Sequence, residues 1–330
     1  MMKTIYILIV CAALFSCTKE NSDEFFPYPN NILNDTAWTT EAAAGAQVHI
    51  IPEIISFPAR IDSFDATTGG AVIFNDGPTV TIPPASCNFQ NGTVATGRVR
   101  IEVIALRTKG DFVRFARPTT SYHRLLESGG AFYIRATKDG QELSLAQSKP
   151  VTIKYRYANP VNDMRVFYGE QNTAQGPLGN NGGFTWIPAQ DNSRVSPFEG
   201  RDSMNNPIRG YELISQRFRW VNCDYFIDTT QPRTRINAVL PPSFTNKNTT
   251  VFAVFKDRNI VVQLTPEFAS RSFFAFNIPV GKNITLLSLS KIENDLFLSK
   301  IETPVAAGLT LQLKPELKTK AQVIQFLESL

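Results

Sequence analysis

The sequence predicts an all-β protein built from two tandem antiparallel β-sandwiches, with a short helix at the C-terminus. Residues 98–103 and 151–157 alternate polar and apolar side chains with a period of two, which is typical of strands that have one buried face. The pairs Asp76-Gly77 and Asp139-Gly140 separate such segments, and glycine tolerates the positive φ of a tight hairpin turn. A chain of 330 residues corresponds to about two domains.

The beginning of the chain has the pattern of an export signal. Lys3 precedes an apolar run over residues 5–15, and the small residue Ser16 stands directly before Cys17. A signal peptide has this order of residues, and the run is shorter than the ~20 residues that span a bilayer. The tetrapeptide Leu-Phe-Ser-Cys that ends at Cys17 resembles the lipobox of bacterial lipoproteins. The resemblance implies that residues 1–16 are cleaved off after Ser16 and that Cys17 carries the lipid. A plain secretory signal is the alternative.

The residues after the lipobox favour a tether. Residues 18–31 are polar, acidic and proline-containing, so they cannot bury enough apolar surface to fold. We therefore expect residues 17–40 to connect the lipid to the folded part of the chain. The acidic patch also resembles the export signal of Bacteroidetes lipoproteins on the outside of the outer membrane. This resemblance implies lipid anchoring in the outer membrane, with cell-surface exposure left open because an ordinary acidic linker has the same composition.

Composition divides the folded part into two domains. The first sandwich is expected over residues 41–158, and within it His49 lies on an alternating segment that we interpret as a strand. Residues 160–210 are rich in Gly, Asn and Pro, which predicts long loops at the start of a second sandwich over residues 159–314. The strands of the second sandwich are expected at residues 217–225, 234–240, 251–255, 260–264, 273–278, 284–289 and 309–313.

A helix is expected at the end of the chain, within residues 315–330. Thr319 and Gln322 have the spacing of a capping box, in which each side chain satisfies a backbone N–H of the first turn. The apolar residues that follow recur with helical spacing, so the helix is expected to pack against the second sandwich.

Part of the chain resembles a known module. The residues that carry a similarity to an Ig-like, ZU5-type β-sandwich are 69–71, 79–85 and 97–106. Residues 125–134 and 139–143 resemble a module of uncharacterised Bacteroidetes surface lipoproteins, whose second β module has marks similar to residues 220–226 and 278–281. The resemblance implies two successive β modules and little about activity. The His-Phe-Ser motif at which some ZU5 domains cut themselves is absent from the sequence.

The composition argues against most enzyme classes and against nucleic-acid binding. The net charge of +4 is far below the basic excess of a nucleic-acid-binding protein. His49 and His123 are the only histidines, and the chain has no Gly-x-Ser-x-Gly segment, so no catalytic triad is indicated. Cys87 and Cys223 are expected to be buried thiols rather than a disulfide. We expect no enzymatic activity and no cofactor.

Two groups of residues are candidates for ligand binding. Asp191, Glu199 and Asp202 are oxygen donors in one loop region, which suits a calcium ion, although their spacing matches no EF-hand. Phe184 and Trp186 follow a glycine-rich segment, and aromatic rings on exposed loops stack on sugar rings. A tryptophan in the core of the second sandwich is the alternative interpretation.

We expect a lipid-anchored cell-envelope protein with a structural or binding role. Its partners would be the membrane, through the lipid, and a glycan or another envelope protein. Three alternatives stay open. A glycan-binding lipoprotein predicts an exposed Trp186 and a groove between the domains. A pilus or adhesin subunit needs a removable N-terminal segment and a groove that accepts it, and a carboxylate-based hydrolase needs acids clustered in a cleft.

Overall fold

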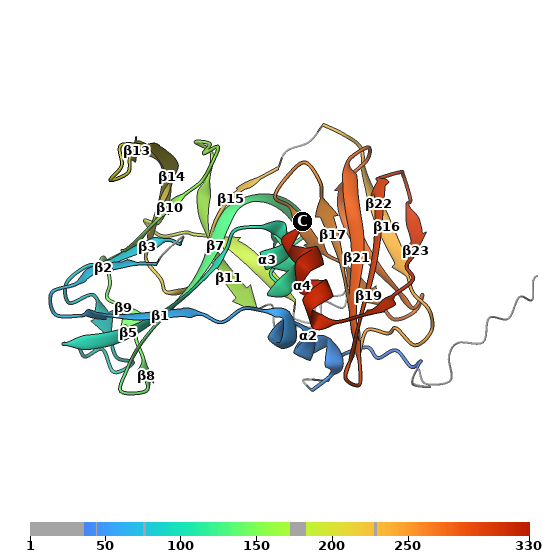
Figure 1. Cartoon of the computed structure of the whole chain (residues 1–330), viewed down its shortest axis with the longest axis horizontal. Coiled ribbons are helices and arrows are strands. Elements are labelled where there is room, and N and C mark those ends of the chain that lie inside the picture. The colour runs from blue at the N-terminus through green and yellow to red at the C-terminus, as the bar shows by residue number, and fades with distance from the viewer. Residues whose placement is uncertain (1–35, 44, 75–76, 172–182, 228–229) are drawn as a thin grey trace, which may run out of the picture. The chain divides into compact units, whose positions relative to one another are not determined.

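The computed structural model describes residues 36–330 apart from residues 44, 75–76, 172–182 and 228–229 (Figure 1). Residues 35–330 form one compact unit. Antiparallel strands dominate this unit, and the chain ends in a short helix, so the predicted all-β class is confirmed. Ser16 and Cys17 lie outside the described residues.

The first sandwich consists of two main sheets. Sheet 1 has the order β1 (Arg60–Asp65), β5 (Arg98–Leu106), β7 (Arg124–Lys138), β15 (Arg219–Phe226), β11 (Arg165–Gln171) and β12 (Phe184–Pro188), with β6 (Thr120–Ser121) and β8 (Gln141–Glu142) paired to β7. Sheet 2 has the order β13 (Arg194–Arg201), β14 (Pro207–Ser215), β10 (Val151–Arg156), β3 (Thr79–Ile82) and β2 (Gly70–Ile73). A small ribbon pairs β4 (Cys87–Asn88) with β9 (Ser144–Leu145). Apolar side chains from both main sheets form one buried cluster between them.

The second sandwich begins at Arg233. Sheet 3 has the order β19 (Thr265–Glu267), β20 (Ser272–Pro279), β16 (Arg233–Val239) and β23 (Thr310–Gln312), of which β16 and β23 are parallel. Sheet 4 has the order β18 (Val261–Gln263), β17 (Thr249–Phe255), β21 (Asn283–Ile292), β22 (Asp295–Pro304) and β24 (Glu316–Lys318).

The strand pairing differs from the domain boundary expected between residues 158 and 159. β14 pairs with β10, and β15 pairs with β7, so both strands complete sheets that begin earlier in the chain. The segment interpreted as long loops contains four strands, β11 to β14. Its Gly, Asn and Pro residues mark the turns between these strands and not a change of domain, because hydrogen bonding to the earlier sheets decides where the strands belong.

Three helices are described, and Figure 1 shows them between the strands of the two sandwiches. α2 (Gln47–Ile55) occupies the segment of His49 that was expected to be a strand, so this prediction is wrong. The apolar residues Ile51 and Ile55 are one helical turn apart and are both buried, which favours the helical period over the alternating one. α3 (Lys109–Arg114) and α4 (Lys320–Glu328) complete the set.

The predicted C-terminal helix and its cap are confirmed. The Thr319 side chain accepts a hydrogen bond from Gln322 N (3.2 Å), and the Gln322 side chain accepts one from Thr319 N (2.9 Å). The helix packs against α3 and α2 as well as the second sandwich, since Val323 and Leu327 belong to a cluster shared by both sandwiches. Among the described residues, no helix has the length and apolar character needed to cross a membrane.

Hydrogen bonds join the two sandwiches along the edge strand β18. Thr119 N donates to Val261 O (2.7 Å), and Val261 N donates back to the Thr119 hydroxyl (2.9 Å). Ser128 N donates to Asn259 O (3.1 Å). These bonds and the shared apolar cluster hold the two sandwiches in one arrangement, which positions the cavities at their junction.

The last residues of the expected tether belong to the folded unit. Trp38 packs its ring against Phe273 with centroids 5.1 Å apart. Asn246 holds the backbone of Thr39 on both sides: its Nδ2 donates to Thr39 O (2.7 Å), and its Oδ1 accepts from Thr39 N (3.2 Å). The part of the tether described by the structure is therefore packed on the second sandwich.

Candidate functional site

Two neighbouring cavities lie where the sandwiches meet. Cavity 1 has a volume of about 160 Å³ and is lined by the turn between β6 and β7, by β12, and by the segment from β18 to β20. Cavity 2 has a volume of about 430 Å³ and is lined by α2, by residues 115–117, and by parts of β17 and β18. Phe184 and Gln263 are among the residues that line both. We call the two cavities together the cleft.

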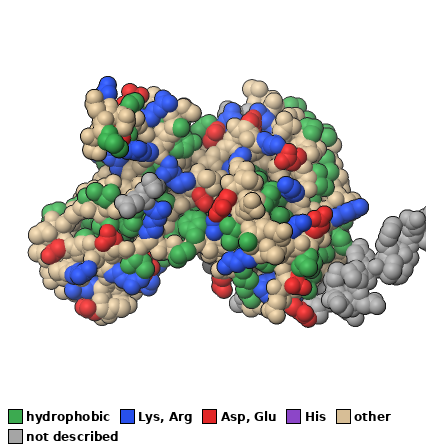
Figure 2. Space-filling view, viewed as in Figure 1, with side chains coloured by type: hydrophobic (Ala, Val, Ile, Leu, Met, Phe, Trp, Pro, Cys, Tyr) green, Lys and Arg blue, Asp and Glu red, His purple; other side chains and the backbone are tan. Residues whose placement is uncertain are grey.

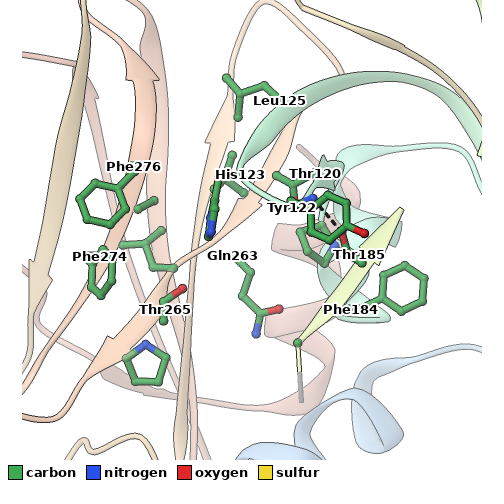
Figure 3. A pocket seen from close by; sticks show the side chains of 16 residues that line it. Thr120, Tyr122, His123, Leu125, Phe184, Thr185, Gln263, Thr265, Phe274 and Phe276 are labelled. Atoms are coloured by element: carbon green, nitrogen blue, oxygen red, sulfur yellow. Dashed lines mark hydrogen bonds between the residues drawn. The ribbon is translucent and has the colours of Figure 1, made fainter. Parts of the chain in front are cut away.

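The side chains of cavity 1 come from both sandwiches. Figure 3 shows Phe274 and Phe276 on one side and Tyr122 and Thr185 on the other, with His123 between them. The two phenylalanine rings meet edge to face with centroids 4.9 Å apart. Phe276 is 36% exposed and Tyr122 is 62% exposed, so both rings are accessible to a ligand.

The backbone of the β6–β7 turn is fixed from two directions. Tyr122 has a φ of 54°, in the left-handed region that non-glycine residues rarely adopt. Its N–H donates to the Thr185 hydroxyl (2.8 Å), and the Asn277 side chain donates to His123 O (3.2 Å). The turn therefore presents Tyr122 and His123 to the cavity from a conformation that both sandwiches support.

Cavity 2 contains a guanidinium. The Arg117 side chain lies over the Phe184 ring at 4.3 Å and over the Trp220 ring at 5.2 Å from its central carbon. Burial lowers the pKa of Arg117 to about 10, so the group remains a cation at neutral pH. His49 and Glu53, one helical turn apart on α2, line the same cavity and are exposed.

Trp186 does not occupy the exposed position that sugar stacking needs. It is 0% exposed, and its Nε1 donates to Pro118 O (2.9 Å). Its ring packs edge to face on Phe184 and Trp220. The prediction of an exposed Trp186 is wrong, because the whole indole is enclosed by the shared cluster. It also belongs to the first sandwich and not to the core of the second. Phe184 is largely buried yet contributes to the walls of both cavities.

The three carboxylates proposed for calcium serve separate local structures. Asp191 accepts hydrogen bonds from the Tyr168 hydroxyl (3.0 Å) and from Ser193 N (3.0 Å). Asp202 accepts from Asn206 N (2.9 Å) at the β13–β14 turn. Glu199 lies on β13. The described residues contain no group of three or more His, Cys, Asp and Glu side chains that could hold a metal ion. The calcium prediction is therefore not supported, since Asp191 and Asp202 accept hydrogen bonds from their own surroundings and Glu199 lies on a strand.

The two histidines line different cavities, and the two cysteines line neither. His49 lines cavity 2 and His123 lines cavity 1. Cys87 and Cys223 are buried free thiols, as expected. Burial raises the pKa of the Cys87 thiol to about 11, which makes it a poor nucleophile at neutral pH.

Sequence reasoning missed Arg117 and the aromatic residues of cavity 1. Arg117 follows α3, and its two ring partners come from β12 and β15, so no local pattern marks it. Phe274 and Phe276 alternate along β20, which predicted a strand but not which of its faces borders a cavity.

The comparisons with known proteins give no relative. No family model matches the chain, and neither does any curated protein or solved structure. The resemblance to ZU5-type sandwiches and to Bacteroidetes lipoproteins stays a prediction.

Proposed function

We propose that the chain is a lipid-anchored cell-envelope protein that binds a saccharide, without catalysis, in the cleft between its sandwiches. The lipobox-like sequence ending at Cys17 supports the anchor and the outer-membrane location. The observation that carries the binding role is the lining of the cleft, in which aromatic rings stand beside neutral polar side chains.

The lining suits the surface of a sugar. A pyranose has apolar C–H faces that stack on aromatic rings and hydroxyls that need donors and acceptors. Cavity 1 offers the accessible rings of Tyr122 and Phe276 together with Thr120 and Gln263. Gln263 uses one N–H for the Thr250 hydroxyl (3.0 Å) and keeps hydrogen-bonding capacity on its amide.

The charges of the cleft favour binding over hydrolysis. Glycoside hydrolysis requires two carboxyl groups on either side of the scissile bond. Among the described residues that line the two cavities, Glu53 is the single carboxylate. The face of the protein in Figure 2 carries both basic and acidic side chains over its surface, which does not suit a polyanion such as nucleic acid.

A binding screen with a matched pair of variants tests this proposal. The detergent-solubilised full chain is applied to a panel of neutral and acidic oligosaccharides, and affinities for the hits are measured by calorimetry. Phe276→Ala removes an accessible ring from cavity 1 and should weaken binding by about tenfold. Phe268→Ala removes a ring that is 52% exposed and does not line either cavity, so it should leave the affinity unchanged.

Two results would contradict the proposal. One is that no oligosaccharide binds the full chain. The other is that Phe276→Ala and Phe268→Ala have the same affinity as the unaltered protein, which would place any binding outside cavity 1, whose accessible rings carry the proposal.

A further inference from the structure

The hydrogen bonding of Arg117 is incomplete. Nη1 donates to Ala116 O (3.2 Å), whereas Nε is buried and has no hydrogen-bond partner within the described part of the chain. The rings of Phe184 and Trp220 cover the guanidinium through cation–π contacts but accept no hydrogen bond in its plane. Nε therefore lacks an acceptor among the described residues, although the side chain forms part of the wall of cavity 2.

No carboxylate among the described residues compensates the charge of Arg117. Desolvation dominates the shift that lowers its pKa, and the one opposing charge effect comes from the Tyr133 phenol rather than from a carboxylate. Arg114, which is buried nearby on α3, differs in both respects. Its Nε donates to Ile55 O (2.7 Å), and its Nη1 pairs with Glu328 (3.3 Å). A partly buried cation without an acid partner costs free energy that a bound anion would recover.

Glu53 is the acid at the wall of cavity 2, but it does not neutralise the charge of Arg117. It is exposed, so water screens its charge. It does not contribute to the pKa shift of Arg117. The sequence between Gln171 and Gly183, which are both at the cavity wall, contains no Asp or Glu. An anion at Arg117 is therefore best supplied by a ligand.

The rest of the cavity limits which anion fits. Arg117 is the one Arg or Lys side chain among the described residues that line the cleft, so a singly charged group matches it better than a doubly charged phosphate. A planar carboxylate fits the donor fork of a guanidinium. Phe115 and Phe273 add apolar surface to the cavity, and its volume of about 430 Å³ lies in the range of small-molecule sites.

We infer that Arg117 is an anion subsite and that the saccharide bound in the cleft carries a carboxylate, as a uronic acid does. This inference rests on the proposed function, because it names the ligand class of the same cleft. The carboxylate pairs with Arg117 in cavity 2, and the neutral part of the saccharide extends toward Gln263 and cavity 1.

Pairs of ligands that differ only in the carboxylate test whether the protein recognises that group. Each uronic-acid oligosaccharide of the panel is tested on the full chain together with its carboxyl-reduced, neutral counterpart. The acidic member should bind about tenfold more tightly in low salt, and the difference should shrink as salt is added. Arg117→Met should abolish the preference for the acidic member. Arg124→Met removes a guanidinium that covers the Phe226 ring at 3.7 Å and lines neither cavity, so the preference should remain.

A second variant keeps the test valid if Arg117→Met fails to fold. Glu53→Gln changes an exposed side chain and removes the single carboxylate found among the described residues of the cavity wall. It should increase the preference for the acidic member by about twofold at low salt, because water screens most of the repulsion between Glu53 and the ligand carboxylate.

The outcomes separate the inference from the proposed function. Equal binding of the acidic and neutral members would overturn the inference and leave saccharide binding in place. A preference that survives Arg117→Met, or that Glu53→Gln does not raise, would also overturn it. Absence of binding to both members of every pair would overturn the proposed function and the inference with it.

Discussion

The two sandwiches bury their strands differently. In β10 of the first sandwich, Val151, Ile153 and Tyr155 are buried and alternate with more exposed residues. In β17 of the second sandwich, all seven residues of the strand are buried. Sheet 4 is covered on one face by the helices and the first sandwich, through the cluster that contains Phe252 and Val254. The cleft lies at the edge of this doubly covered sheet, since β17 and β18 contribute to its walls.

The polar groups buried in the two sandwiches also differ. The first sandwich buries the titratable side chains of Tyr155, Cys223 and Asp224. Sheet 4 buries mainly hydroxyls, with Lys291 as a buried charged side chain, and the Thr249 hydroxyl donates to that of Ser290 (2.8 Å). Hydroxyl pairs are neutral at all ordinary pH values. Above about pH 5, the pH dependence of stability should therefore arise mainly in the first sandwich.

The largest loss of stability is expected from substitutions that test whether β17 is buried on both faces. Phe252 belongs to the shared cluster, and Phe255 lies at an odd spacing from it, on the opposite face of the strand. Phe252→Ala and Phe255→Ala should each lower the free energy of unfolding by about 3–5 kcal/mol, because each creates a cavity in a packed core. Urea denaturation of the full chain measures both.

The alternating strand provides the matched control for that experiment. In β10, Ile153→Ala should cost about 2–5 kcal/mol, whereas Thr152→Ala should change the free energy of unfolding by about 0.5 kcal/mol or less. If Phe255→Ala were tolerated as well as Thr152→Ala, the face of sheet 4 turned away from the helices would not be buried as described.

A smaller loss of stability is expected from a substitution at the contact between α3 and α4, which cover sheet 4. A Cβ atom on Gly110 of α3 would lie 1.9 Å from Leu327 O of α4, closer than any real contact. Gly110→Ala should therefore cost about 1–3 kcal/mol of unfolding free energy, although alanine is the better helix former. Gly200→Ala, where the nearest side-chain atom is 3.9 Å away, is the control and should be close to neutral. Equal stability of the two variants would show that α4 does not dock on α3.

Period and capping predicted most of the elements but not their grouping. The alternation at residues 98–103 and 151–157 corresponds to β5 and β10, and the Thr319 capping box begins α4. The sequence could not show that β15 pairs with β7, because such pairing depends on hydrogen bonds between segments far apart in the chain. A five-residue apolar pattern around His49 was compatible with both periods, and burial against sheet 4 decided for the helix.

The cleft was less predictable than the fold. Trp186 was a reasonable candidate for stacking because it follows a glycine-rich segment, yet its indole is held by the Pro118 carbonyl and the Trp220 ring, which are distant in the sequence. Arg117 had no signal at all, since an unpaired guanidinium can be recognised only when the positions of all nearby carboxylates are known. A groove between the domains was among the expectations, but its wall residues depend on the packing of β6, β12 and β20.

Asp224 of the first sandwich lies at the bulge where the register of β15 and β7 shifts. Its carboxyl is fully buried, and Oδ2 accepts a hydrogen bond from Asn222 Nδ2 (2.7 Å). Oδ1 has no hydrogen-bond partner among the described residues. Burial raises the pKa of Asp224 well above its usual range, although the hydrogen bond from Asn222 acts in the opposite direction. The folded protein therefore keeps a proton that the unfolded chain releases near pH ~4.

This difference in proton binding makes the free energy of unfolding depend on pH. Because the unfolded state binds fewer protons than the folded state, stability falls as the pH rises above ~5, by at most about 1.4 kcal/mol per pH unit, for as long as the folded protein keeps this proton. Acids with a lowered pKa, such as Asp191 and Glu267, act in the opposite sense only below about pH 5. Asp224→Asn should therefore gain stability relative to the unaltered protein as the pH rises, in urea titrations above about pH 5. Ser288→Ala, which removes a buried hydroxyl from sheet 4, should shift the curve by the same amount at every pH. Parallel curves for Asp224→Asn and the unaltered protein would show that the carboxyl is not buried in its neutral form, and the contrast between the two sandwiches would be lost.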